Sequence, residues 1–409
     1  KMASHILAEI SRSELAGLSA PDGRISGLEH LASYNWLNKP APTISVPVVT
    51  GSPPLWSPPS GPVKLTPDSG LVYIDQNAAR NPRFPLEPLF RALFTEHPDF
   101  NIGDIDLVTD RNNIRKLLRF AQGSSGQRFQ IQVEIAGDTT ALFTRVEKNT
   151  KTFIRHGDFQ GYGHNFENAY TKKQSGSTGH HRMVGYDFGG LKCIVRHETD
   201  GYVGDKTPNT REEPTDNLSN ALRGLSLSNS KAKSDSTTKH PAPPAGAVAV
   251  KTGGTTVDVS STLEIKTRPA TRKLKMCEVY PQLWISQTPN LVVGYHQESL
   301  FDNVQLRDTA EDLRRWETAK QETLRRLAGL LAKIIAVVKQ SSDRTALVEY
   351  NGSSSLRILG GKGKRALPDD LYARWEGKGE VDVEQSASAD EGDDARLKMK
   401  DEEGEVVSG

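Results

Sequence analysis

Several short segments of the chain alternate apolar with polar residues, and others are continuous apolar runs. Residues 128–134 alternate Phe, Ile and Val with polar side chains, and an apolar segment, residues 141–146, follows Gly137 and Asp138. A period of two is typical of a β-strand, and a tight turn between two such segments favours an antiparallel pair. Further apolar, β-rich runs predict strands at residues 191–195, 262–267, 291–295 and 345–350.

Helical periodicity appears in two places. Residues 85–94 predict a helix, and a longer amphipathic pattern runs from Leu313 to Val338. Thr309 stands three residues before Asp312, which is the spacing of an N-terminal capping box. We therefore expect one long capped helix that packs on a sheet. The mixture of strands and helices predicts an α+β fold with a mixed β-sheet core flanked by helices.

The composition distinguishes an N-terminal segment, a domain with an insertion inside it, and a C-terminal tail. Residues 1–70 include a Pro-rich stretch from Pro40 to Pro62, where proline disfavours a regular helix or central strand, so we expect an extended N-terminal segment. Residues 71–375 are predicted to form a single domain. Within that domain, residues 204–258 lack aromatic side chains and are rich in Ser, Thr, Pro and Gly. Such a segment buries too little apolar surface to fold, so it predicts a disordered insertion.

The charges nearly balance overall but are distributed unevenly. Lys and Arg number 52 against 51 Asp and Glu, and acidic residues dominate residues 376–409, which we predict to be a disordered acidic tail. The remainder is net basic, which suits a polyanionic substrate. The two cysteines, Cys193 and Cys277, are too few for a disulfide framework or a zinc cluster. No apolar run is long enough to span a bilayer, so the protein is expected to be soluble, intracellular and without a membrane partner.

Two charged pairs carry the candidate chemistry. They are Glu198 with Asp200, and Glu264 with Lys266, each pair separated by one residue. Residues i and i+2 of a strand share a face, so the members of each pair should point the same way. If the two strands are neighbours, three carboxylates and one ammonium group converge, and a hard divalent cation, Mg²⁺ or Mn²⁺, would relieve the repulsion between the carboxylates. Lys266 would then orient a water molecule or stabilise negative charge.

This pattern is weak by itself, because alternating charges are common on exposed strands. Leu263 and Ile265 flank Glu264 with apolar side chains, which suggests a carboxylate near a buried position. On spacing alone a structural interpretation remains ahead of a catalytic one. The histidines His164, His180 and His181 are more typical of a solvated Gly/Ser-rich segment than of a metal site. Trp284 and Trp316 are expected in the core.

A series of short motifs between residues 106 and 350 adds to this evidence. In order, they are Arg111 in a predicted strand-to-helix segment, Gly163-His164-Asn165-Phe166-Glu167, Glu198-Thr199-Asp200, Glu264-Ile265-Lys266-Thr267, Gln282, and the apolar run from Thr288 to Tyr295. In this order the chain resembles the DXO family of decapping nucleases, as a divergent member of the fungal type with a PD-(D/E)xK nuclease-like fold. Asp110 and Asn112, beside Arg111, depart from the family's pattern.

The resemblance implies a role for each motif residue. Glu167, Asp200 and Glu264 would bind the metal directly with the backbone carbonyl of Ile265, and Glu198 would act through bound waters. Lys266 and Gln282 would contact the scissile phosphate and the attacking water. Arg111 would hold an RNA backbone phosphate. The catalytic set is then Lys266, Glu264, Asp200 and Gln282, and the substrate-binding set is Arg111, Gln282 and Lys266.

The same resemblance implies an activity. Such enzymes hydrolyse incomplete or non-canonical RNA 5′ caps, including nicotinamide-dinucleotide caps, and some continue as 5′-to-3′ exoribonucleases. It also implies a nuclear location, with the cytoplasm as the alternative. Two other functions stay open: a non-catalytic partner that binds and stabilises a nuclear exoribonuclease, and a DNA nuclease on the same scaffold.

Overall fold

The computed structural model describes residues 5–46, 52–124, 127–158, 161–204, 248–252, 256–361 and 363–376. Most of the predicted insertion and almost all of the predicted acidic tail lie outside these residues. One described part of the predicted insertion is ordered: residues 249–252 form a strand that pairs in parallel with residues 43–46.

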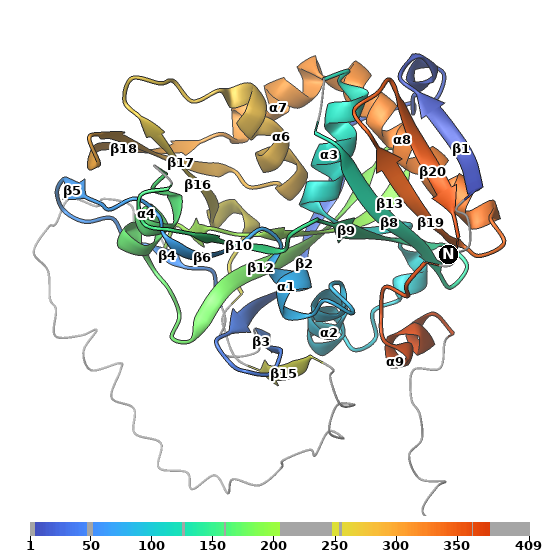
Figure 1. The fold of residues 1–409 in the computed structure, drawn as a ribbon, viewed down its shortest axis with the longest axis horizontal. Helices are drawn as coiled ribbons and strands as arrows, with labels where there is room; N and C mark the ends of the chain where they lie inside the picture. Colours follow the sequence, from blue (N-terminus) through green and yellow to red (C-terminus); the bar gives the residue numbers. More distant parts are fainter. Residues whose placement is uncertain are drawn as a thin grey trace, which may run out of the picture.

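The described residues form two large β-sheets and a small two-stranded ribbon (Figure 1). The larger sheet has eleven strands in the order β1 (His5–Ser11), β20 (Ser355–Gly360), β19 (Thr345–Tyr350), β8 (Phe129–Ala136), β9 (Thr140–Val146), β7 (Leu107–Asp110), β13 (Leu191–Glu198), β12 (Ser177–Phe188), β2 (Ile25–Leu37), β3 (Thr43–Val46) and β15 (Ala249–Thr252). The smaller sheet has seven described strands in the order β11 (Thr171–Lys172), β4 (Leu55–Trp56), β14 (Gly201–Tyr202), β16 (Thr262–Pro269), β17 (Asn290–Gln297), β18 (Leu300–Asp308) and β5 (Val63–Lys64). The ribbon pairs β6 (Gly70–Tyr73) with β10 (Lys151–Ile154).

Helices surround the sheets. The α-helices are α1 (Gln76–Arg80), α2 (Glu87–Glu96), α3 (Arg111–Ala121), α4 (Gly163–Tyr170), α6 (Met276–Ser286), α7 (Ala310–Ala319), α8 (Gln321–Gln340) and α9 (Asp369–Tyr372). Short 3₁₀ turns span Ser13–Ala16, Ile102–Asp104, Val259–Ser261 and Ala373–Trp375. None of the helices described is both long and apolar enough to cross a membrane.

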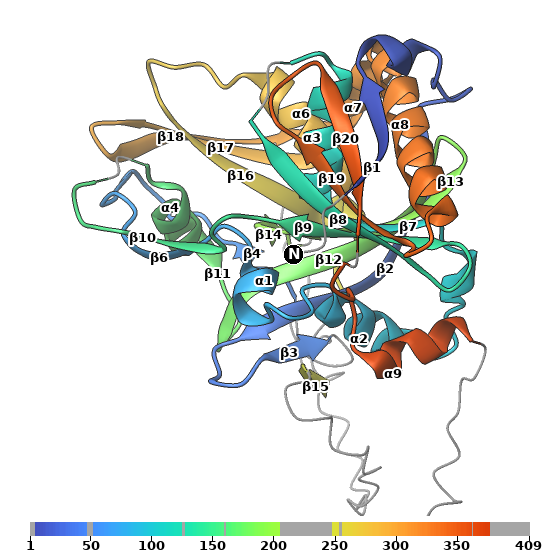
Figure 2. The same cartoon turned by 45° about the vertical axis from the view of Figure 1, so that its right-hand side comes forward.

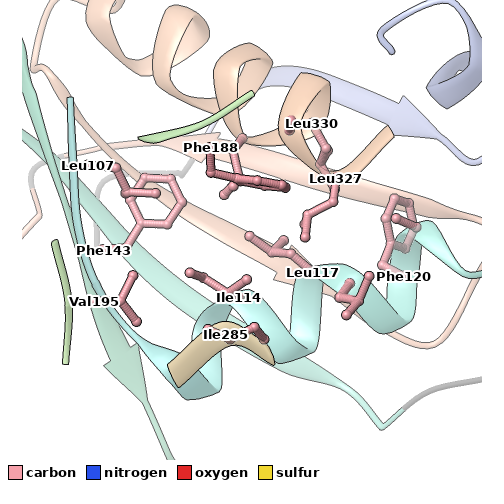
Figure 3. Packing of buried hydrophobic residues seen from close by; sticks show 14 of the residues in the cluster. Leu107, Ile114, Leu117, Phe120, Phe143, Phe188, Val195, Ile285, Leu327 and Leu330 are labelled. Atoms are coloured by element: carbon pink, nitrogen blue, oxygen red, sulfur yellow. The ribbon is translucent and has the colours of Figure 1, made fainter. Parts of the chain in front are cut away.

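The large sheet is covered on both faces. Helices α3, α6 and α8 lie on one side and α2 lies on the other, as Figures 1 and 2 both show. In β13, Cys193 and Val195 join the core beneath α3 and α8, whereas Ile194 between them joins the core beneath α2. Figure 3 shows Val195 on the same side as the α3 residue Leu117. Two covered faces explain why this strand is a continuous apolar run instead of an alternating one.

The N-terminal prediction is wrong for residues 5–46. Strand β2 pairs along its length with β12 inside the large sheet, and its Tyr34 and Trp36 are fully buried. Proline does not prevent this, because Pro40 lies in the connection between β2 and β3. In the Pro-rich part farther along, β4 and β5 are only two residues long, as expected where prolines interrupt backbone pairing.

The predicted strands and the first helix are confirmed, whereas the long helix needs a correction. Strands β8 and β9 form the predicted antiparallel pair, with Ala136 opposite Thr140. The single helix predicted over residues 313–338 is instead two helices, α7 and α8, that meet at Lys320. Thr309 makes no capping bond, because its hydroxyl donates to the carbonyl of Pro289 (2.8 Å). Apolar periodicity does not reveal this break, since both helices bury residues at helical spacing.

Candidate active site

Asp200 lies where the chain passes from one large sheet to the other. Strand β13 ends at Glu198, and after two intervening residues the chain enters β14, where Gly201 pairs with Leu263 of β16. The prediction required β13 and β16 to be neighbours, but they belong to different sheets and β14 connects them. Asp200 Oδ2 accepts a hydrogen bond from the amide of Ile265 at 2.8 Å. This bond holds the Asp200 carboxylate next to the strand that carries Glu264.

Glu264 is the most enclosed carboxylate of the group, only 2% exposed. Its oxygens accept from the guanidinium of Arg111 (Nη1 to Oε2, 3.0 Å), the ammonium of Lys266 (2.5 Å) and the side-chain amide of Gln282. Burial alone would raise the pKa of Glu264, but Lys266 and Arg111 outweigh it and lower the pKa to about 2. Glu264 is therefore ionised at neutral pH and is the anionic centre of the site.

Three further carboxylates interact electrostatically with Glu264 or with one another. Their pKa values are raised, whereas that of Glu264 is lowered. Burial, then repulsion from Glu264, raises the pKa of Asp200 to about 7. Burial, then repulsion from Asp200 and Glu198, raises the pKa of Glu167 well above its ordinary value. Burial also raises the pKa of Glu198, although nearby Arg111 opposes this. Added positive charge at this place would relieve the repulsion.

Among the four carboxylates, Glu198 is the one that is exposed to solvent. The side chain of Glu198 is exposed, and burial is nevertheless the largest cause of its raised pKa. A cavity of about 120 Å³ opens there. Its lining includes Glu198, Arg111, Arg115, His181 and His197. A small anionic group entering from solvent would meet Arg111 beside the carboxylates.

The structure thus brings together all the residues that were predicted to form the site: Arg111, Glu167, Glu198, Asp200, Glu264, Ile265, Lys266 and Gln282. Lys266 and Glu264 share a face of β16, as their spacing predicts, while Ile265 is buried in the core between them. Gln282 comes from α6, where it is 8% exposed. Their individual roles stay predictions.

The donor set suits a hard divalent cation, because it consists of carboxylate oxygens that repel one another. The side-chain positions are less favourable. Among the described residues, no three His, Cys, Asp or Glu side chains are placed to hold a metal ion together. Glu264 directs its oxygens to Arg111, Lys266 and Gln282 instead. Metal binding would require these three donors to give up at least one oxygen of Glu264.

One supporting ion pair was missed from the sequence. Arg196, 1% exposed, binds Asp110 through two hydrogen bonds, Nε to Oδ1 at 2.6 Å and Nη2 to Oδ2 at 3.0 Å. Because Asp110 immediately precedes Arg111, this pair fixes the start of α3, where Arg111 is placed. Asp110, which departs from the motif of the DXO family that the chain resembles, therefore has a structural role in this protein. The available signal was an arginine inside the apolar strand of residues 191–198, since a buried charge needs a partner.

The interpretation of the histidines as solvated is wrong for His180 and His181. Both are buried in β12. His180 Nδ1 lies 2.9 Å from Asn35 Oδ1, and His181 Nε2 lies 3.1 Å from Gln76 Oε1. Burial, assisted by nearby arginines, lowers the pKa of each well below its ordinary value, so both rings are neutral core residues. The core positions predicted for Trp284 and Trp316 are confirmed.

Comparisons with known proteins agree with this fold. A family model described as "Domain of unknown function (DUF8563)" matches residues 14–375. No curated protein matches the chain in sequence.

The solved structures that this chain resembles include two that cover more than nine tenths of it. The structure of Candida albicans Rai1 in complex with pU5-Mn²⁺ has a TM-score of 0.54 and 10% identity, covering 91% of this chain and 99% of that one. The structure of Scheffersomyces stipitis Rai1 in complex with (3′-NADP)⁺ and calcium ion has a TM-score of 0.54 and 12% identity, covering 92% and 99%. At such low identity the similarity shows a shared fold, which confirms the predicted mixed α+β architecture.

Proposed function

Since this chain belongs to the family described as "Domain of unknown function (DUF8563)" and has the fold of two fungal Rai1 proteins, we propose that it is a metal-dependent hydrolase acting on RNA 5′ ends. Its substrates are RNAs with incomplete or non-canonical caps, including nicotinamide-dinucleotide caps. The ligands named for the two Rai1 structures, pU5-Mn²⁺ and (3′-NADP)⁺ with calcium, support RNA, a divalent metal and a dinucleotide as the ligand chemistry.

One observation carries the proposal: four carboxylates gather beside three hydrogen-bond donors in a recess open to solvent. The carboxylates Glu167, Glu198, Asp200 and Glu264 come from α4, β13, the connection to β14, and β16. The mutual repulsion of these carboxylates costs stability, and proteins retain such clusters at functional sites more often than elsewhere.

Different residues of the site would have different roles in hydrolysis. Glu167, Asp200 and Glu264 would hold a divalent cation, with Glu198 acting through water and the backbone carbonyl of Ile265 as a further ligand. Such an ion supplies polarisation of a phosphoryl oxygen and a bound water of lowered pKa.

The donors now engaged with Glu264 would turn to the substrate. Arg111 binds a backbone phosphate, and Lys266 and Gln282 orient the attacking water and the scissile phosphate. Water oxygen attacks phosphorus, the bond to the leaving oxygen breaks, and the water proton passes to solvent or the leaving group. Once released from Glu264, these donors would stabilise the negative charge that develops on the phosphate.

A second function has one observation in its favour. Glu264 is already satisfied by Arg111, Lys266 and Gln282, and an arrangement of this kind would also suit a fold kept only to bind and stabilise an exoribonuclease. Four intact carboxylates at one place argue for the hydrolase, because a purely structural role would gain stability by losing some of them.

The test compares RNA 5′ ends directly. Purified protein is incubated in Mn²⁺ or EDTA with RNAs that carry a triphosphate, a nicotinamide-dinucleotide cap or a methylated cap, and with DNA of the same sequence. We expect Mn²⁺-dependent release from RNA, abolished in Glu264→Ala and retained in Glu322→Ala, whose side chain is 79% exposed on α8. Absence of release from every RNA, with tight binding to an exoribonuclease, would favour the second function. Equal cleavage of DNA would contradict specificity for RNA.

A further inference from the structure

A second, larger cavity lies next to the candidate site. It has a volume of about 720 Å³ and shares Ile74, Asn112, Arg115 and Arg145 with the smaller cavity at Glu198. Its basic lining residues are Arg115, Lys116, Arg119, Arg128, Arg145 and Lys148, against two acidic ones, Glu147 and Glu349. A space of this size accommodates far more than one phosphate group.

Three arginines on α3 lead from the site into this cavity. Arg111, Arg115 and Arg119 are spaced by four residues, which places them on one face of the helix about 6 Å apart along its axis. Arg111 lines the smaller cavity, Arg115 lines both, and Arg119 lines the larger one. Figures 1 and 2 show α3 between the seven-stranded sheet, which carries Glu264, and strands β8 and β19, which border the larger cavity.

Most of this positive charge has no counterpart within the described part of the chain. Lys116 and Arg145 both pair with Glu147, at 2.8 and 2.7 Å. Arg115, Arg119, Arg128 and Lys148 form no ion pair with a described residue. Burial, then repulsion from Arg111 and Arg119, lowers the pKa of the half-buried Arg115 to about 10. Such crowding of unpaired guanidinium groups costs stability that a bound polyanion would recover.

We propose that this cavity binds the phosphodiester backbone of the RNA strand on the 3′ side of the bond that is cut, with Arg115 and Arg119 as positioning residues. The proposal rests on the proposed function. A row of cations rising by helical turns matches a chain of phosphates better than a single small anion. Ile74, 40% exposed and shared by both cavities, offers an apolar surface to a base at the passage between them.

Binding measurements that need no turnover separate this proposal from the proposed function. Fluorescence anisotropy in EDTA would give the affinity of the full chain for a 5′-phosphorylated ten-nucleotide RNA and for a dinucleotide of the same 5′ sequence. We expect the longer RNA to bind more tightly, and Arg119→Ala to weaken its binding roughly fivefold, with a smaller effect on the dinucleotide. The slope of log affinity against log salt should become shallower by about 0.7 for each phosphate of the single strand that a variant fails to neutralise.

Controls make the outcomes distinct. Arg119→Lys keeps the charge and should restore most of the affinity, while Arg314→Ala removes an exposed arginine on α7 and should leave both affinities unchanged. Length-dependent binding that needs Arg119, without cleavage of any RNA, would support binding of the RNA backbone in this cavity but overturn the proposed function, and with it the assignment to the 3′ side of a cut bond. Cleavage with affinity that is independent of RNA length, or unaffected by Arg115→Ala and Arg119→Ala, would overturn this proposal alone.

Discussion

The ring of Phe166 packs against Gly294 so closely that a methyl group added to Gly294 would collide with it. Phe166 precedes Glu167 in α4, and Gly294 pairs with Thr267 of β16, the strand that carries Glu264. This contact therefore fixes how near α4 approaches β16. The Gly-aromatic ending of the apolar run at residues 288–295 thus has a packing role that places a candidate metal ligand.

Gly294→Ala should displace α4 and, with it, Glu167. Overpacking at this position is expected to reduce the free energy of unfolding by about 1–3 kcal/mol. Misplacement of Glu167 should lower the rate of Mn²⁺-dependent RNA hydrolysis roughly a hundredfold. The matched control is Gly61→Ala, because a methyl group there meets no other atom. Equal activity of the two variants would show that Gly294 does not position Glu167.

Asp110→Asn should destabilise the protein strongly. The substitution leaves Arg196 buried without its carboxylate, and removing one partner of a buried ion pair costs about 3–5 kcal/mol. Urea denaturation followed by circular dichroism would measure the change. Asp104→Asn is a suitable control, because Asp104 is exposed and has no ion pair with any described residue. A loss below about 1 kcal/mol for Asp110→Asn would mean that Arg196 finds other partners.

Metal-free protein should lose stability through Asp200 as the pH rises from about 4 to 7. The folded-state pKa of Asp200 is raised to about 7, so across this window the folded chain holds a proton that the unfolded chain has released. The stabilisation is complete below the unfolded pKa and is lost as the pH passes the folded one, with a slope of at most about 1.4 kcal/mol per pH unit.

The comparison with Asp200→Asn isolates this term, because buried neutral histidines contribute the opposite slope to both proteins. Urea unfolding at half-unit pH steps in EDTA should show that the free energy of unfolding of the variant rises relative to that of the wild type up to about pH 7. A stability difference that stays constant with pH would contradict the raised pKa.

Mn²⁺ should raise the melting temperature more at pH 8 than at pH 6. The raised pKa values of Glu167, Glu198 and Asp200 mean that binding a cation must displace protons. At a hundredfold excess over Kd, the ion stabilises the fold by about 2.7 kcal/mol. Scanning calorimetry measures the shift, and titration calorimetry in two buffers counts the protons released. Glu167→Gln should reduce both quantities, whereas Glu322→Gln should change neither.

The sequence predicts the strands near the site well, because their apolar runs report burial directly. All but the first of residues 128–134 lie in β8, residues 141–146 lie in its partner β9, and residues 262–267 lie in β16. The N-terminal strands were missed, because the prolines after residue 39 indicated an extended segment outside the sheets, whereas residues 25–37 pair with β12. Long-range pairing of this kind has no local signal.

The proximity of the motif residues could be predicted from the sequence, but the way in which the fold brings them together could not. The motif residues do meet, yet the i, i+2 argument supposed one sheet, and spacing cannot show that the chain changes sheets at Asp200. The ion pair of Asp110 with Arg196 and the arginine row on α3 depend on tertiary neighbours. Sequence motifs also could not indicate that Glu264 would be bonded to Arg111, Lys266 and Gln282.

The passage of the chain between sheets at Asp200 has a mechanical consequence. Glu198 ends a strand of one sheet, while Glu264 belongs to the other, so the gap between these carboxylates is set by how the two sheets rest on each other. A cation bound by Glu264 directly and by Glu198 through water would link the two sheets, and its affinity would depend on how the sheets are aligned. Substitutions in the apolar core between the sheets, far from any ligand, would then change the affinity for the ion by changing the alignment of the sheets.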